Sequence, residues 1–339
     1  MHRCLTLAET AAGHVAPNPM VGAVLVHDDT IIGEGYHRVY GGPHAEVNCI
    51  DSVPAHLRHL INASTLYVSL EPCAHFGKTP PCADLIIRHR IPRVVIGCRD
   101  PFKEVNGRGI EKLLAAGIAV ETGVLERECM ALNKRFFTFH TRFRPYVVLK
   151  WAQTGDGRIG NEGSERLQIS GASANRLVHK WRSEEASILV GTRTAAMDNP
   201  RLTNRLWSGP SPVRLVVDLH LRLPRSLHLF DGSARTIVFN AQKEEQEESI
   251  TYCRIAGNES LVHQLTARLY QLGINSVMVE GGAQLLQSFI DAGIWDEARV
   301  LTNPGLIIGR GVAAPRLSHQ RMVAEQYIGH DRLDEYVRS

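Results

Sequence analysis

Four residues with metal-binding or acid–base side chains follow one another in an order typical of a catalytic zinc site. His44 precedes Glu46 by two positions, and Cys73 and Cys82 follow after one intervening predicted strand. Zinc binds imidazole nitrogen and thiolate sulfur readily, and a catalytic zinc site combines three protein ligands with an open position for water. We therefore interpret His44, Cys73 and Cys82 as the zinc ligands. Glu46 is the acid–base residue that takes a proton from the attacking water and returns it to the leaving group.

Prolines beside these residues complete a known combination. Pro43 precedes His44 and Pro72 precedes Cys73, as in the H-x-E and P-C-x-x-C pattern of zinc-dependent nucleobase deaminases. We place His44 and Cys73 each in the first turn of a helix, where exposed N–H groups favour a thiolate. A buried thiol or a helix-capping histidine would explain any one of these residues alone, but the combination favours the metal site. The remaining cysteines are predicted core thiols: Cys4, Cys49, Cys98, Cys129 and Cys253.

The spacing of the two cysteine ligands departs from that pattern. Eight residues separate Cys73 from Cys82 instead of two, so both cannot occupy one short helical turn. The insertion must loop out and return Cys82 to the metal at the start of the next helix. Because the loop carries His75, Lys78 and Thr79, we predict that it reads the substrate at the mouth of the site. The alternative is a Gly- and Pro-rich turn that serves only the shape of the loop.

The surrounding elements predict α/β sheets with helices on both faces. In the first part, a hairpin is expected over 20–33, strands over 66–70, 93–97 and 118–120, and helices after Pro43, near Pro72 and over 109–116. A second series of strands is expected over 146–150, 188–191, 214–218, 236–239 and 276–280, with the polar run 242–248 as a solvated loop or exposed helix face. Pro145 interrupts the chain between the two series. We therefore expect two domains, residues 1–143 and 146–339.

Composition narrows the possible partners and the compartment. The chain of 339 residues has a formal net charge of +3, with no block of Lys and Arg and no long uncharged apolar run. This argues against a nucleic-acid partner and against a membrane span. Single arginines beside loop signals suit a small phosphorylated substrate. The N-terminus lacks the pattern of a secretory signal, so we expect a cytoplasmic protein, and we expect it to form a homo-oligomer.

The loop between the two cysteine ligands has a specific resemblance to one family. The stretch from His75 to Cys82 resembles that of the bifunctional deaminase/reductases of riboflavin biosynthesis, the RibD family. The similarity extends over nearly the whole chain, at 17–22, 33–37, 100–101 and 106–109 in the first half and at 149–150, 156–157, 191–205 and 280–282 in the second.

The resemblance implies two folds and two reactions. The N-terminal half would be a cytidine-deaminase-like three-layer domain with a mixed sheet. It would release ammonia from 2,5-diamino-6-ribosylamino-4(3H)-pyrimidinone 5′-phosphate. The C-terminal half would be a dihydrofolate-reductase-like α/β domain that reduces the ribosyl side chain to ribityl with NADPH. This agrees with the lack of a G-x-G-x-x-G run after the first strand of the second half. Gly281-Gly282 instead opens a helix that could receive cofactor phosphates, although such a pair is often only a turn.

The resemblance also implies residue roles. Cofactor contacts would come from Gln153, Gln168, Arg193, Thr194, Asp198, Gly282, Ala283 and Gln284. Substrate contacts would come from Asn18, His75 and Lys78 in the first half and from Arg166, Arg182, Leu202, Arg205 and Glu280 in the second. Without the resemblance, the arginines would equally fit an ordinary solvated surface. Arg193 is our candidate for the NADPH 2′-phosphate, with Arg222 as the alternative. Gln168-Ile169-Ser170 replaces the Trp-Ile-Thr of many members, so an aromatic wall beside the nicotinamide is either absent or supplied by Trp151.

Two rival interpretations fit part of this pattern. One is a single-activity deaminase for a free base, nucleoside or tRNA, with a non-catalytic second half; the cysteine spacing and the weak charge speak against tRNA. The other is a zinc-stabilised nucleic-acid-binding protein without chemistry. Glu46 argues against it, because a structural zinc site fills its fourth position with another Cys or His.

Overall fold

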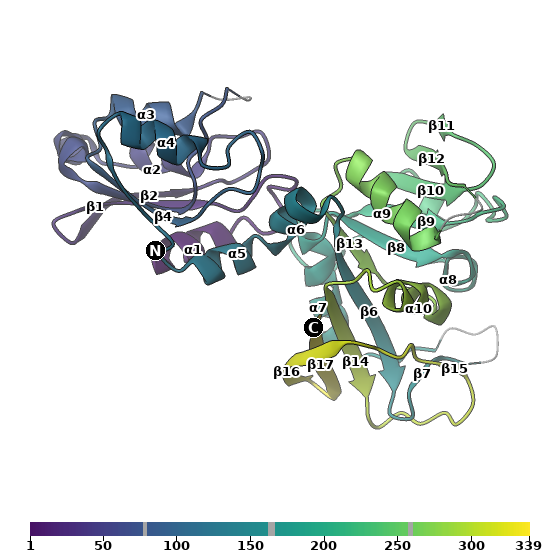
Figure 1. Cartoon of the computed structure of the whole chain (residues 1–339). Coiled ribbons are helices and arrows are strands. Elements are labelled where there is room, and N and C mark those ends of the chain that lie inside the picture. Colours follow the sequence, from purple (N-terminus) through teal and green to yellow (C-terminus); the bar gives the residue numbers. More distant parts are fainter. Residues whose placement is uncertain (77–79, 162–166, 257–259) are drawn as a thin grey trace. The chain divides into compact units, whose positions relative to one another are not determined.

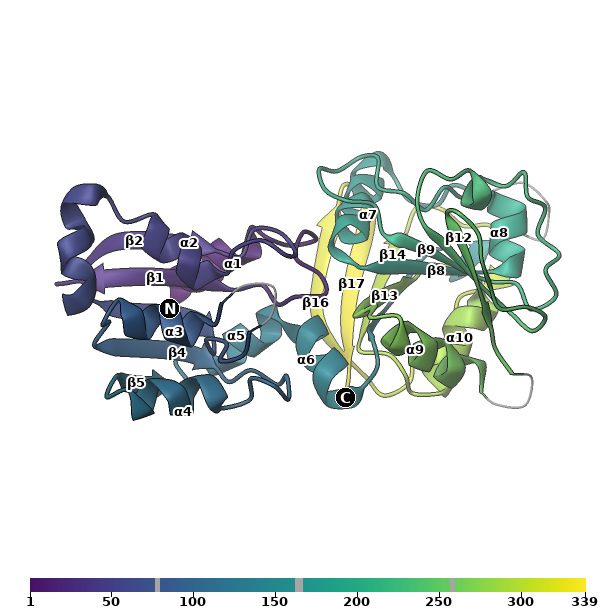
Figure 2. The ribbon, with the colours of Figure 1, turned by 90° about the horizontal axis from the view of Figure 1, so that it is seen from above.

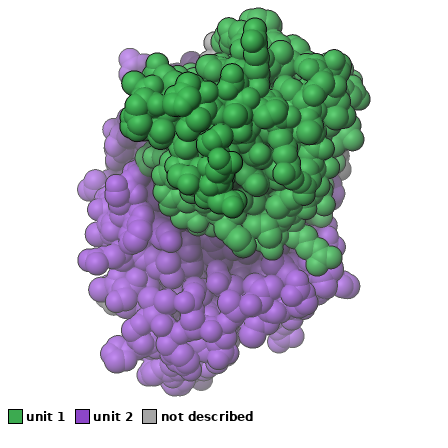
Figure 3. Space-filling model, turned by 90° about the vertical axis from the view of Figure 1, so that its left-hand side faces the viewer, with its two compact units in different colours: residues 1–143 green, residues 144–339 purple. Residues whose placement is uncertain are grey.

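A computed structural model describes residues 1–76, 80–161, 167–256 and 260–339 of the chain. The chain divides into two compact units, Met1–Phe143 and Arg144–Ser339, which are coloured separately in Figure 3. Lys78, Thr79 and Arg166, three of the residues selected from the sequence, lie outside the described residues. Within the described residues, none of the helices has the length and apolar character that crossing a membrane requires.

The first unit is built on a five-stranded mixed sheet of order β2-β1-β3-β4-β5. β1 pairs antiparallel with β2 and β3, whereas β3, β4 and β5 run parallel. The strands are β1 (Gly22–His27), β2 (Thr30–Tyr36), β3 (Thr65–Leu70), β4 (Arg93–Cys98) and β5 (Ala119–Thr122). The predicted hairpin and the three predicted strands that follow it are all present.

Helices cover both faces of this sheet. Figure 1 shows α2, α3 and α4 on one face and α1 and α5 on the other. The larger core cluster joins the sheet to α2, α3 and α4, and a smaller cluster joins its other face to α1, α5 and α6. The helices are α1 (His2–Glu9), α2 (Ala45–Asp51), the 3-10 helix η1 (Ala55–Ala63), α3 (Cys82–Arg88), α4 (Arg108–Ala115), α5 (Glu126–Leu132) and α6 (Lys134–Arg142).

One predicted helix of this unit is wrong. No helix begins near Pro72; Cys73 lies in an extended loop, and the next helix, α3, begins at Cys82. One contact accounts for the difference. The carbonyl oxygen of Cys73 accepts the backbone N–H of Ala83 at 3.1 Å, so Cys73 satisfies the first turn of α3 from outside the helix.

The second unit is built on a ten-stranded sheet of order β11-β12-β10-β9-β8-β13-β6-β14-β17-β16. The run from β12 to β14 is parallel, and β11, β17 and β16 are antiparallel to their neighbours. The strands are β6 (Tyr146–Thr154), β8 (Ser187–Gly191), β9 (Val213–Val217), β10 (Thr236–Asn240), β11 (Glu245–Gln246), β12 (Ile250–Arg254), β13 (Ser276–Val279), β14 (Glu297–Asn303), β16 (Gln320–Ile328) and β17 (Asp331–Arg338).

Each face of this sheet has its own core. Along β6, Val147 and Leu149 pack into one cluster, and Val148 packs into the other, as the two-residue period of a strand requires. Figure 2 shows α7 and α8 on one side of the sheet and α9 and α10 on the other. The remaining elements are α7 (Ala172–Glu184), α8 (Thr192–Asp198), α9 (Leu261–Gln271), α10 (Ala283–Asp291), the 3-10 helix η2 (His228–Phe230) and the small pair β7 (Arg158–Gly160) and β15 (Val312–Ala313).

The polar run 242–248 is not wholly the loop or helix face that was expected. Its central residues form the short strand β11, which pairs antiparallel with Thr251 and Tyr252 of β12. The sequence shows no alternation of apolar and polar residues here, because both residues of β11, Glu245 and Gln246, are polar and exposed. Pairing with β12 decides the conformation here, since local polarity alone does not separate a loop from an edge strand.

Candidate zinc centre and reductase site

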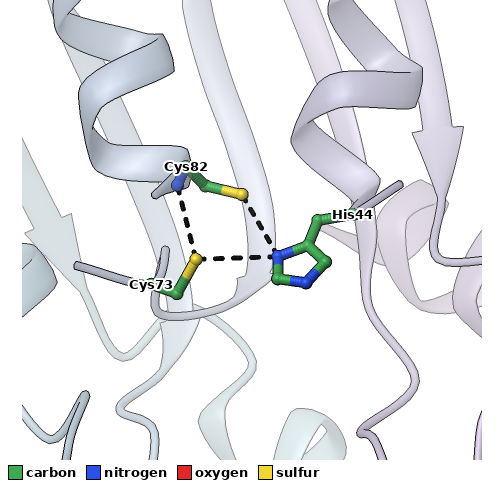
Figure 4. Close-up of side chains that lie close together, drawn as sticks. All are labelled: His44, Cys73 and Cys82. Carbon is green, nitrogen blue, oxygen red and sulfur yellow. Dashed lines mark hydrogen bonds between the residues drawn. The ribbon is translucent and has the colours of Figure 1, made fainter. Parts of the chain in front are cut away.

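The three predicted zinc ligands meet at one point of the first unit. His44 is the extended residue that caps α2, Cys73 lies in the loop after β3, and Cys82 is the first residue of α3. The Nδ1 atom of His44 lies 3.6 Å from Cys73 Sγ and 3.3 Å from Cys82 Sγ, as Figure 4 shows. The backbone N–H of Cys82 also donates to Cys73 Sγ at 3.3 Å. The loop therefore returns Cys82 to Cys73 at the start of a helix, as the spacing predicted.

The geometry of this cluster fits zinc. With Zn–S bonds of about 2.3 Å and a Zn–N bond of about 2.0 Å, a tetrahedral ion separates nitrogen and sulfur ligands by roughly 3.5 Å. Both measured nitrogen–sulfur distances are close to that value, and all three ligand atoms lie within 4.8 Å of one another. Nδ1 is the ring nitrogen that faces the sulfurs. Among the described residues, this group includes no fourth His, Cys, Asp or Glu ligand.

Glu46 lies beside the ligands but outside their set. It occupies the first turn of α2 and is buried. Burial, followed by the charge of Cys73, raises the pKa of Glu46 to about 6. A carboxyl group with such a pKa can both accept and give up a proton near neutral pH.

Hydrogen bonding prepares Cys73 to be a thiolate. The Cys82 side chain, and then His44, lower the pKa of the Cys73 thiol by hydrogen bonds to its sulfur. The expected cause, a place in the first turn of a helix, is wrong for Cys73, because this residue is in a loop. The N-terminus of α3 still contributes through the backbone N–H of Cys82.

Asn18 is held next to the zinc ligands by a histidine that the sequence analysis did not select. His37 Nδ1 donates to the carbonyl oxygen of Pro43 at 2.9 Å, which leaves Nε2 to accept from Asn18 Nδ2 at 3.1 Å. Burial lowers the pKa of His37, in keeping with this neutral form. The ring of His37 also packs edge-on against that of His44, with 5.5 Å between centroids. The turn that carries Asn18 is therefore tied to Pro43 and His44, directly before α2.

Asn133, also missed in the sequence, holds the other end of this turn. The backbone N–H of Met20 donates to Asn133 Oδ1 at 2.8 Å, and Asn133 Nδ2 donates to the carbonyl oxygen of Met20 at 2.9 Å. Asn133 is buried and lies between α5 and α6, 113 residues along the chain from Met20. No local sequence pattern identifies such a residue, because its amide pairs with the backbone of a residue far away in the sequence, as a neighbouring strand would.

Glu71, two residues before Cys73, organises a second loop. Its buried carboxylate accepts the backbone N–H groups of Asp100, Gly107, Gly109 and Ile110 at 2.9–3.3 Å. These bonds join the strand end before Cys73 to the segment that leads into α4. At Gly109 a Cβ atom would lie 1.9 Å from the carbonyl oxygen of Pro72, so only glycine permits this close approach.

His75 faces this same segment. Its ring packs edge-on against Phe102 at 5.9 Å, and Phe102 in turn lies 5.0 Å from the ring of His140 on α6. The Nδ1 atom of His75 is buried and has no hydrogen-bond partner in the described structure.

In the second unit, four predicted substrate residues form one cluster. Arg182 on α7 makes a bidentate pair with Glu280, which follows β13, at 3.0 and 2.6 Å. The carbonyl oxygen of Thr203 accepts from both Arg182 and Arg205, and Leu202 is buried beside it with a φ of +54°. Burial opposes the ionisation of Glu280, but Arg182 and Lys150 outweigh it and lower its pKa to about 2.

The predicted cofactor residues are only partly brought together. Thr194 on α8 lies against the glycines before α10: a Cβ atom at Gly281 would be 2.9 Å from Thr194 Cγ2. Gly282 caps α10 with a φ of +70°, and Ala283 and Gln284 begin this helix. β8 and β13 are parallel neighbours, so the loops after them share one edge of the sheet.

The other predicted cofactor residues have separate surroundings. Gln153 accepts from Trp151 Nε1 at 2.8 Å and donates to Thr302 at 3.3 Å. Trp151 on β6 packs into a hydrophobic core cluster with 5% of its surface exposed. Gln168 and Arg193 are exposed, and Asp198 is the last residue of α8.

Comparisons with known proteins identify the family. Residues 1–98 match the family model for the cytidine and deoxycytidylate deaminase zinc-binding region, and residues 145–328 match that for the RibD C-terminal domain. The riboflavin biosynthesis protein RibD of Aquifex aeolicus is 39% identical over 321 residues, which cover 92% of this chain and 88% of that protein. The chain belongs to the RibD family. RibD of Escherichia coli is 34% identical over 325 residues, covering 91% of this chain and 87% of that protein.

A solved structure agrees over the full length. The Thermotoga maritima diaminohydroxyphosphoribosylaminopyrimidine deaminase/5-amino-6-(5-phosphoribosylamino)uracil reductase has 37% identity and a TM-score of 0.90, covering 100% of this chain and 97% of that one. Both expected folds are therefore confirmed. The RibD family chain is a bifunctional riboflavin-biosynthesis enzyme with a zinc-dependent deaminase unit and an NADPH-dependent reductase unit.

Proposed function

We propose that the first unit hydrolyses the 2-amino group of 2,5-diamino-6-ribosylamino-4(3H)-pyrimidinone 5′-phosphate, and that the second reduces the ribosyl side chain of the product to ribityl. The observation that carries the first step is a three-ligand His/Cys/Cys cluster with a buried carboxyl group beside it. The Thermotoga maritima relative is described as acting on such pyrimidines. The second step rests on the Arg182, Arg205 and Glu280 cluster, which suits an anionic sugar phosphate.

In the deaminase unit, we assign the ligand roles to His44, Cys73 and Cys82. Zinc, when bound, makes water a nucleophile at neutral pH. Glu46 would take a proton from the attacking water as its oxygen forms a bond to the ring carbon that carries the 2-amino group. It would then pass this proton to the amino nitrogen, so that the carbon–nitrogen bond breaks, ammonia leaves and the oxygen stays on the ring carbon. Its pKa of about 6 suits both transfers.

We assign substrate binding in this unit to three residues around the ligands. Asn18 is fixed by His37, which leaves its side-chain oxygen for a donor on the pyrimidine. His75 presents a buried ring nitrogen without a protein partner in the described structure. Lys78, outside the described residues, would meet the phosphate from the same loop.

In the reductase unit, NADPH supplies the hydride that reduces the sugar. We assign cofactor contacts to Gln153, Gln168, Arg193, Thr194, Asp198, Gly282, Ala283 and Gln284. Arg166, Arg182, Leu202, Arg205 and Glu280 would hold the substrate. Arg182 donates two hydrogen bonds to Glu280. It therefore orients this carboxylate as well as adding positive charge to the site.

The decisive assay supplies the diamino-pyrimidinone phosphate to the full-length protein. Ammonia release should proceed without NADPH, because hydrolysis needs no reductant. Oxidation of NADPH should begin only once deaminated product has formed, with one NADPH consumed per ammonia released. Lack of ammonia release from zinc-loaded protein, or lack of NADPH oxidation with the deaminated compound, would refute the corresponding half of the proposal.

We further propose a cytoplasmic homo-oligomer. All seven cysteines lie within the described residues and each is a free thiol, which suits a reducing compartment. β16 is an edge strand that exposes Met322, Val323 and Tyr327, a surface able to pair with a second copy. A solution mass equal to that of one 37.6 kDa chain at micromolar concentration would contradict self-association.

The two units should fold and function separately. Each has its own sheet and its own apolar core, and α6 ends at Arg142 before the strand β6 begins at Tyr146. We expect a fragment of residues 1–143 to bind zinc and deaminate without NADPH. The matched fragment 144–339 should reduce the deaminated substrate. A soluble, zinc-loaded and inactive first fragment would show that the units depend on each other.

Arg193 should read the 2′-phosphate that distinguishes NADPH from NADH. It is exposed at the second position of α8, next to Thr194. Loss of one charge-assisted hydrogen bond costs roughly 1.5–3 kcal/mol, so Arg193→Ala should weaken NADPH binding about ten- to a hundredfold. NADH binding should hardly change. Titration of both coenzymes measures the ratio.

Arg222, exposed beyond β9, provides the matched control. Arg222→Ala should leave the coenzyme ratio unchanged if Arg193 has this role. Equal weakening of NADPH and NADH by Arg193→Ala would mean that the side chain supports the loop. If only Arg222→Ala lowers the ratio, the 2′-phosphate contact belongs to Arg222.

A further inference from the structure

A buried histidine joins two parts of the reductase cluster. His179 lies on α7, one helical turn before Arg182, and only 5% of its surface is exposed. Its Nδ1 atom accepts the backbone N–H of Arg205 at 2.9 Å. The contact links α7 to a residue 26 positions further along the chain. The proposed reaction assigns the His179 ring no role of its own.

The segment that His179 contacts contains a residue in an unfavourable backbone conformation. Leu202 is buried with a φ of +54°, a left-handed conformation that is unfavourable for a bulky side chain. Surrounding contacts must therefore stabilise the segment. Arg182 and Arg205 both donate to the carbonyl oxygen of Thr203, and Asn204 Nδ2 donates to that of Gly209 at 3.1 Å. His179 provides the acceptor for the backbone at Arg205.

The chemistry of the imidazole matches this contact. Burial, and then the positive charges of Arg182 and Arg205, lower the pKa of His179 to about 4. The ring is therefore neutral at physiological pH. Because Nδ1 accepts a hydrogen bond, the single ring proton must be on Nε2. A lysine or arginine at this position would have no acceptor, and an aliphatic residue would leave the Arg205 N–H without its partner.

We propose that His179 is a positioning residue for substrate binding in the reductase site: its Nδ1 acceptor fixes the Arg205 backbone and so places the Arg205 and Arg182 guanidinium groups around the phosphate of the substrate. This inference rests on the proposed reductase function. It assigns His179 no direct part in hydride transfer, because its Nδ1 atom binds the protein backbone at Arg205. Its effect should therefore appear in substrate binding more than in turnover.

Two variants of the full-length protein separate this role from simple packing. His179→Leu fills a similar volume but removes the acceptor. His179→Asn is smaller and keeps an acceptor oxygen near the position of Nδ1. We expect His179→Leu to raise KM for the deaminated, phosphorylated substrate about tenfold, the effect of losing one hydrogen bond. Its kcat should stay within about twofold, and KM for NADPH and ammonia release by the other unit should be unchanged. His179→Asn should recover most of the loss.

Arg205→Ala distinguishes failure of this inference from failure of the proposed site. It removes the guanidinium group but keeps the backbone N–H that His179 accepts. A raised KM in Arg205→Ala and in His179→Leu, with recovery in His179→Asn, supports the positioning role. A raised KM in Arg205→Ala alone overturns that role and leaves the substrate site standing. An unchanged KM in Arg205→Ala overturns the substrate site and the positioning role with it. Equal loss in His179→Asn and His179→Leu shows that packing, and not the acceptor, is what matters.

Discussion

Glu46→Gln is expected to remove deamination while leaving zinc binding and the fold intact. Glutamine has nearly the same shape as glutamate but cannot take up a proton at neutral pH, so only the proton transfer is lost. Groups in acid–base catalysis typically contribute ~10²–10⁴-fold, and we expect at least that decrease in the rate of ammonia release. Reduction of the substrate supplied in deaminated form should continue, because it takes place in the other unit.

The control for this variant is Glu9→Gln, which makes the same change at an exposed position at the end of α1. It should deaminate at the normal rate. Zinc content of both variants, measured by elemental analysis, should remain near one per chain. Ammonia release from Glu46→Gln within a fewfold of normal would remove Glu46 from the reaction. Loss of zinc from this variant would instead make it a ligand.

Cys73→Ala should lose most of the zinc. Three protein ligands hold the ion, and alanine removes the thiolate that the surrounding hydrogen bonds favour most strongly. The remaining His44 and Cys82 provide only two ligands, fewer than the three that catalytic zinc sites use. Deamination should fall with the zinc content, and reduction of the deaminated substrate should persist.

Cys253→Ala is the matched control, because it removes a buried thiol of the second unit that belongs to no metal-ligand group among the described residues. It should keep about one zinc per chain and normal ammonia release. Metal analysis after dialysis against a weak chelator gives the comparison. A zinc content near one per chain in Cys73→Ala, with activity retained, would show that the metal is held by other residues.

Much of the fold could be predicted because the relevant patterns are local. The hairpin β1–β2 follows from two largely apolar runs on either side of the polar residues His27, Asp28 and Asp29, and the parallel strands follow from short apolar runs between helices. The interruption at Pro145 marks the passage to the second series. The errors occurred where local chemistry was ambiguous. Pro72 looked like a helix start, but Cys73 contributes its carbonyl to a helix that begins at Cys82.

The site residues also divide into those that local sequence patterns reveal and those that depend on contacts between distant segments. His44, Glu46, Cys73 and Cys82 were recognisable because their residue types are rare and their order is characteristic of metal chemistry. Asn133, Glu71 and His179 were not recognised. Each binds backbone groups far away in the sequence, at Met20, around Gly107 and at Arg205 respectively. An amide, a carboxylate or an imidazole with such a role resembles any other polar residue until its partner is known.

The sequence by itself determined the donor chemistry, the alternation of strands and helices, and the resemblance that pointed to two enzymes in one chain. Only the tertiary structure decided that His44 presents Nδ1 to the two sulfurs, that Cys73 is in a loop, and that Trp151 belongs to the core. The physical reason is that residue types and short periods depend on neighbours along the chain. Ligand geometry, the burial that raises the pKa of Glu46 and the hydrogen bonds that hold the loops depend on segments that meet only after folding.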